Sequence, residues 1–111
     1  MPSALTVIGP SVFADCSSLA NVVIPVGVTS IDTFAFRNCM RLRSITFPAT
    51  LSRIGSFAFD GCRYYFRSAI FEGDAEWRIS GSESTFIPDD GREAATCLRE
   101  TYVTEVWLRV D

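Results

Sequence analysis

The four cysteines are the side chains of this sequence best suited to chemistry, and three of them recur at a fixed spacing. Cys16, Cys39 and Cys62 lie 23 residues apart, and Cys97 lies outside this series. Zinc sites use ligand pairs that converge on one ion, and no such pair is present. The spacing instead predicts a ladder of small buried groups, in which a thiol behaves as a small hydrophobic side chain. A disulfide along the ladder stays open, because it depends on backbone geometry.

The remaining candidates for chemistry are weak, because the chain has no histidine and no lysine. No imidazole is present to activate Cys97, and a phosphate-binding lysine loop is excluded. Asp89, Asp90 and Glu93 match no calcium loop and are better explained as helix caps. We therefore expect no catalytic residues, no metal and no cofactor. A small hydrolase that uses an Asp/Glu pair within residues 72–100 is a distant alternative, which would require a deep pocket with two convergent carboxylates.

Length and charge narrow the class of protein further. A chain of 111 residues fits a single domain with its own core. Residues 1–71 hold six arginines and three aspartates, whereas residues 72–111 hold four arginines and ten acids. The first part is too weakly basic to favour nucleic acid, although the two parts could attract each other within or between molecules. No apolar run approaches the length needed to insert into a membrane, and we expect no signal peptide in this chain.

An internal repeat is the strongest pattern in the chain. IDTFAFRNC at 31–39 returns as IGSFAFDGC at 54–62, and Ile8, Ile31 and Ile54 share one column. A fixed period with apolar columns predicts a solenoid, in which each coil completes the core of the next. The repeats run over 2–24, 25–47 and 48–71. The third is one residue longer, because the alternative register would bury Ser68.

Each coil can be divided into local elements. LANVVIP at 19–25 and LRSITFP at 42–48 alternate as strands with one face buried, and proline ends each strand. VTSI at 28–31 and LSRI at 51–54 are short extended segments. The following TFAFRN and SFAFDG are expected to be single 3₁₀ or α turns that place both rings inside. Strands of successive coils are expected to pair in parallel.

These repeats resemble a known family. The pattern L-x-x-I-x-I-P-x-x-V-T-S-I-x-x-x-A-F-x-x-C, over about residues 2–74, is similar to the BspA-type leucine-rich repeat, also called the Treponema pallidum type. The resemblance implies a right-handed, curved solenoid with a parallel sheet on one face. It also implies a setting in surface and adhesion proteins of bacteria and some protists, although nothing in this chain fixes a location. The first coil departs from the pattern at Ser11 and Val12.

Residues 72–111 are expected to form a divergent fourth coil that caps the solenoid. Short strands are predicted at Glu76–Ser80 and Thr85–Ile87, followed by a helix near 90–99 with Asp89 or Asp90 at its start. A final strand near 101–110 is expected to extend the parallel sheet, with Val106 and Leu108 facing inward.

The outward residues of the strands are the candidate binding site of a non-catalytic interaction module. Variable outward positions and nearby arginines predict a partner-binding set: Val23, Arg43, Thr46, Arg67, Ile70 and Trp107. An ordinary solvated face explains the same residues without binding. The partner would be another protein or a second copy of the chain, which would form a homo-oligomer through the uncapped first coil. Alternatively, the chain is a purely structural end piece of a longer adhesin array.

Overall fold

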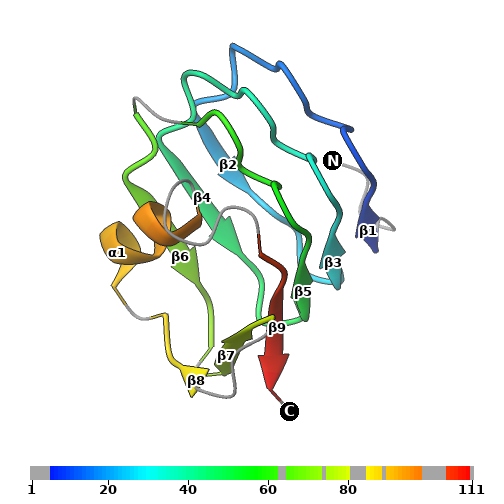
Figure 1. Ribbon diagram of the computed structural model, residues 1–111, viewed down its shortest axis with the longest axis vertical. Helices are drawn as coiled ribbons and strands as arrows, with labels where there is room; N and C mark the ends of the chain where they lie inside the picture. The colour runs from blue at the N-terminus through cyan, green and yellow to red at the C-terminus, as the bar shows by residue number, and fades with distance from the viewer. Residues whose placement is uncertain are drawn as a thin grey trace.

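The structure is a computed structural model that describes residues 6–62, 65–73, 75–80, 85–88, 90–98 and 105–110. Figure 1 shows successive coils in these ranges, followed by a C-terminal cap built from short strands and a helix. The elements, in chain order, are β1 (Val7–Ile8), β2 (Asn21–Val23), β3 (Ser30–Ile31), β4 (Ser44–Phe47), β5 (Arg53–Ile54), β6 (Ser68–Phe71), β7 (Glu76–Ile79), β8 (Thr85–Phe86), α1 (Gly91–Thr96) and β9 (Trp107–Val110).

Each coil contributes one strand to each of two sheets. Strands β1, β3 and β5 pair in parallel, and so do β2, β4 and β6. The two sets lie on opposite sides of the coils, with the core between them (Figure 1). The mainly β architecture with parallel pairing between coils fits the repeat solenoid that the sequence predicts. The short extended segments at 28–31 and 51–54 contain β3 and β5, which are two strands of the six-stranded sheet.

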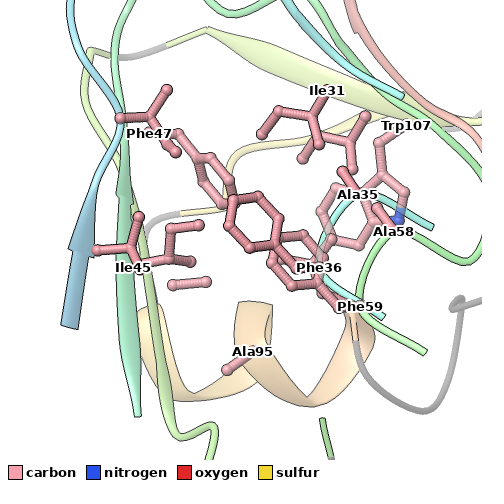
Figure 2. Packing of buried hydrophobic residues seen from close by; sticks show 14 of the residues in the cluster. Ile31, Ala35, Phe36, Ile45, Phe47, Ala58, Phe59, Ala95 and Trp107 are labelled. Carbon is pink, nitrogen blue, oxygen red and sulfur yellow. The ribbon is translucent and has the colours of Figure 1, made fainter. Parts of the chain in front are cut away.

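Equivalent side chains of successive coils lie over one another in the core. Ile8 is opposite Ile31, and Ile31 is opposite Ile54, with all three almost fully buried. The rings of Phe36 and Phe59 stack with centroids 5.3 Å apart, as Figure 2 displays from close by. The expected columns are therefore confirmed, and each coil covers the apolar edge that its neighbour cannot bury alone.

The register of the third coil follows the one-residue insertion. Ile45 pairs with Ala69, and Thr46 pairs with Ile70. This pairing places Ala69 in the core and leaves Ser68 out of it, as the preferred alignment requires.

The segments expected to be single helical turns are instead a series of tight turns. Phe34 and Phe57 have φ values of 61° and 59°, in the left-handed region that a right-handed helix excludes. Alternate amides then have different partners: Arg37 N donates to Phe34 O at 3.1 Å, whereas Phe36 N donates to Ala58 O of the next coil at 2.8 Å. The prediction of a helical turn was wrong because every second amide donates its hydrogen bond to the next coil and not to a carbonyl of its own turn. Phe34 and Phe57 are also only half-buried, with their rings stacked 5.4 Å apart.

The last strand does not continue the repeat. β9 pairs antiparallel with β5, so that Trp107 is opposite Ile54, and pairs with β7 on its other side. The predictions that this strand extends the sheet of β2, β4 and β6, and that Val106 and Leu108 face inward, are therefore wrong. An alternating strand can bury either of its faces, and a shift of one residue exchanges them. Here the face with Trp107 is buried.

The rest of the cap agrees better with the sequence. β7 and β8 form an antiparallel pair at the predicted positions. Asp90 starts α1 by accepting hydrogen bonds from the amides of Arg92 (3.0 Å) and Glu93 (3.1 Å). α1 lies beside β6 (Figure 1), and a Cβ on Gly91 would lie 3.2 Å from Ser68 Oγ, so glycine permits the close approach. Asp89 and Arg99 lie outside the described residues.

Candidate binding surface

The outward face of β2, β4 and β6 carries a row of three side chains across the sheet. Val23 is opposite Thr46, which is opposite Ile70. Val23 is 72% exposed and Ile70 is 49% exposed. Their strand neighbours Val22 and Ala69 point the other way into the core. The strands therefore hold two apolar residues in solvent, with the half-buried Thr46 between them.

A polar row runs beside the apolar one. Ser44 Oγ donates a hydrogen bond of 2.8 Å to Asn21 Oδ1 on the neighbouring strand. On β6 the equivalent residue is Ser68, against which the start of α1 packs. The face is thus bounded by α1 at β6, whereas β2 is an end strand of its sheet.

Two exposed arginines stand where β4 and β6 begin. Arg43 N donates to Ala20 O at 2.7 Å, and Arg67 N donates to Arg43 O at 2.9 Å. The two arginines therefore occupy the same position in successive coils. Beside them lies an open groove of about 350 Å³, and its lining residues are Ala20, Arg41, Arg43 and Tyr65.

Sequence reasoning did not single out Arg41 and Tyr65. Their position in the repeat could have identified them, because Arg41 precedes the buried Leu42 and Tyr65 precedes the buried Phe66 of the same column. Arg43 and Arg67 follow those same two buried residues. The four exposed side chains thus flank the column on both sides, at the corner where the turns meet the strands.

Trp107 does not belong to this face. Its side chain is 1% exposed and stacks on the ring of Phe71 at 5.9 Å, and Figure 2 places it in the core beside Ala58. The prediction that Trp107 points outward is wrong, because β9 joins the other sheet with its tryptophan face inward. The other five predicted residues lie on the face of β2, β4 and β6 or at the start of its strands.

A comparison with family models gives the relationship. The model described as "BspA type Leucine rich repeat region (6 copies)" matches residues 1–74, which is more than half of the chain. The chain belongs to the BspA-type leucine-rich repeat family. No curated protein and no solved structure matches it. Membership indicates a repeat module of the protein-interaction kind, from a family that is typically non-catalytic. The matched part of this BspA-type chain contains the whole outward face of β2, β4 and β6.

Two members of the cysteine ladder of this BspA-type chain, Cys39 and Cys62, are buried inside the coils, and Cys16 is partly buried. Cys39 Sγ donates to Phe13 O and Cys62 Sγ donates to Phe36 O, each at 3.1 Å, and all four cysteines are free thiols. The Cys39 thiol and burial raise the pKa of Cys62 far above its usual range. Burial, with the Glu93 carboxylate nearby, raises the pKa of Cys97. Both shifts disfavour the thiolate that a nucleophile or a metal ligand would require.

The acidic residues of the cap have structural contacts. The Asp90 carboxylate is engaged by the first turn of α1, and it lines a hollow of about 110 Å³ together with Glu93 and Cys97. Within the described ranges, no three potential metal ligands gather. The same part of the chain contains no helix with the length and hydropathy required to cross a membrane.

Proposed function

We propose that this BspA-type chain is a non-catalytic interaction module that binds a protein partner through the outward face of β2, β4 and β6. The observation that carries the proposal is the outward row of Val23, Thr46 and Ile70, with both apolar members exposed, beside two arginines. Arginine is enriched among the residues that contribute most to protein binding, and the apolar side chains beside it add surface that a partner can remove from water. The face is also displayed on rigid strands, which lowers the entropy lost on binding.

A random peptide library selected on the whole chain tests this proposal. Selected peptides should bind the parent chain and lose binding to the double variant Val23→Asp/Ile70→Asp, because buried carboxylates in an apolar contact are costly. The matched control is Ile87→Asp/Val110→Asp, which changes two comparably exposed residues of the cap. Peptides that bind both variants equally would show that the interaction lies elsewhere.

Self-association through the first coil is a second candidate, favoured by a separate observation. Val7, Val12 and Val26 are 42%, 56% and 73% exposed on this coil and just after it, and β1 and β2 are the end strands of their sheets. End strands with apolar neighbours favour pairing with another chain. Sedimentation velocity tests this candidate: the sedimentation coefficient should rise with concentration and fall back in Val12→Asp. A strict monomer at high concentration would exclude a homo-oligomer.

A purely structural unit within a longer surface array remains the competing function. It predicts that the peptide selection yields no binder to the face of β2, β4 and β6. The two proposals therefore differ in a single readout.

A further inference from the structure

The groove beside the outward face has an unusual charge distribution. Arg43 and Arg67 stand at one position of successive coils, and such rungs are about 4.8 Å apart. Arg41 lines the same groove. Like charges on neighbouring strands repel each other, so this arrangement costs stability unless an anion lies between them.

Three other arginines in the described part of the chain have a partner for the guanidinium group, whereas Arg78 and Arg92 have none there. Arg53 pairs with Asp32 at 3.1 Å, and Arg109 Nη1 donates to Leu51 O at 3.0 Å. Arg37 lies over the Phe34 ring at 5.2 Å. Among the described residues, the guanidinium groups of Arg41, Arg43 and Arg67 have no such contact. The segments that carry β2, β4 and β6 contain no acidic residue; they are 19–24, 42–47 and 66–71.

We propose that Arg41, Arg43, Arg67 and Tyr65 form a subsite for an acidic, extended segment of a partner protein. Guanidinium groups bind carboxylates through paired hydrogen bonds, and an exposed tyrosine ring supplies rigid contact area. This inference rests on the proposed function, because the segment would continue from the groove onto the row of Val23, Thr46 and Ile70.

The surroundings favour a peptide over other anions. The apolar row begins three residues further along β4 than Arg43, which is about 10 Å on an extended strand. A peptide can carry carboxylates and apolar side chains at that separation. A nucleic acid would instead require a larger basic surface, and this chain has a net charge of −3.

Titration of the ¹⁵N-labelled whole chain with hexaglutamate, followed by NMR, tests the subsite. The amide signals of Arg43, Tyr65 and Arg67 should shift with hexaglutamate and not with hexaglutamine. The double variant Arg43→Gln/Arg67→Gln should bind about tenfold more weakly, since both charges are removed. The control Arg78→Gln/Arg92→Gln removes two exposed charges elsewhere and should change binding less than about twofold. Binding should weaken strongly in about 0.5 M salt.

Several outcomes would overturn the subsite. Equal binding of hexaglutamine, or equal loss in the control variant, would mean that the groove does not recognise carboxylates. Tighter binding of an oligonucleotide or of inorganic phosphate at the same amides would assign the arginines to a different anion. Self-association at low salt that Arg43→Gln/Arg67→Gln abolishes would make the acidic cap of a second copy the occupant.

The two proposals fail separately. Selected peptides that depend on Val23 and Ile70 but are unaffected by Arg43→Gln/Arg67→Gln would remove the acidic subsite and leave the interaction face intact. Selected peptides whose binding depends neither on Val23 and Ile70 nor on Arg43 and Arg67 would contradict both proposals.

Discussion

The coils and the cap bury their apolar side chains by different rules. In the coils, the partner of a buried residue is the equivalent residue of the next coil, as with Ile31 between Ile8 and Ile54. In the cap, the partner of Ile54 is Trp107, which comes from an antiparallel strand more than fifty residues away in the chain. The end of a solenoid thus needs a differently built element to cover its last coil.

This difference has a consequence for binding. Because β9 pairs with β5 and extends the sheet of β1, β3 and β5, the sheet of β2, β4 and β6 ends at β6, with α1 beside it. The proposed interaction face of β2, β4 and β6 therefore belongs entirely to the coils, and α1 of the cap forms its boundary at β6.

The largest expected effect is the loss of a ring shared between coils. Phe36 stacks on both Phe13 and Phe59 with centroids 5.3 Å apart, and it is fully buried. Phe36→Ala should lower the free energy of unfolding by about 4–5 kcal/mol in urea denaturation. Phe34→Ala is the matched control from the same turn and should cost about 1–2 kcal/mol, because Phe34 is half-buried. Equal costs would contradict the stacking of coils.

The corresponding change in the cap should cost slightly less. Trp107→Ala should lower the free energy of unfolding by about 3–4 kcal/mol. Part of the loss is offset because, among the described residues, the buried indole Nε1 of Trp107 has no hydrogen-bond partner. Trp107→Phe keeps a ring without that group and should retain most of the stability. An unchanged free energy of unfolding in Trp107→Ala would mean that this side chain is exposed.

Gly55 lies where the backbones of the second and third coils approach closely. A Cβ on Gly55 would lie 2.7 Å from Thr33 N, whereas one on Gly9, at the same position of the first coil, would have Val12 Cγ2 at 3.3 Å as its one near neighbour among the described residues. Gly55→Ala should therefore lower the free energy of unfolding by about 1–3 kcal/mol. Gly9→Ala should change the thermal midpoint little. The reverse order would contradict the close approach of the second and third coils.

The smallest effect on stability is expected on the interaction face. Val23→Ser should change the free energy of unfolding by less than about 0.5 kcal/mol, because the side chain is 72% exposed. Val22→Ser, one residue earlier and 7% exposed, is the control and should destabilise clearly. A large cost for Val23→Ser would mean that the face is structural.

The stacking of the coils could be predicted from the sequence because each apolar column recurs in three places. Ile8, Ile31 and Ile54 occur at the same spacing, so periodicity alone predicts which residues meet. The insertion before Phe66 could be placed as well, since only one register keeps Ser68 out of the core. Arg43 and Arg67 could be predicted because each directly precedes an outward-facing strand, whereas Arg41 and Tyr65 lie before the buried Leu42 and Phe66, outside the strands.

The cap could not be predicted in the same way. The segment around Trp107 alternates, and alternation alone specifies neither the sheet that a strand joins nor its direction. The direction of β9 depends on its pairing with β7 and β5, which the alternating pattern does not encode. The left-handed residues Phe34 and Phe57 were missed for another reason: bulky side chains rarely adopt positive φ, and stacking between coils imposes it here.

The pairing of the last strand decides most directly which residues form the interaction face. Interstrand nuclear Overhauser effects of the whole chain would identify the partner of Trp107. The account predicts an antiparallel pattern that connects Arg53 with Leu108 and Ile54 with Trp107. A parallel pattern that connects Trp107 with Ile70 would contradict it, and would return the tryptophan to the exposed row.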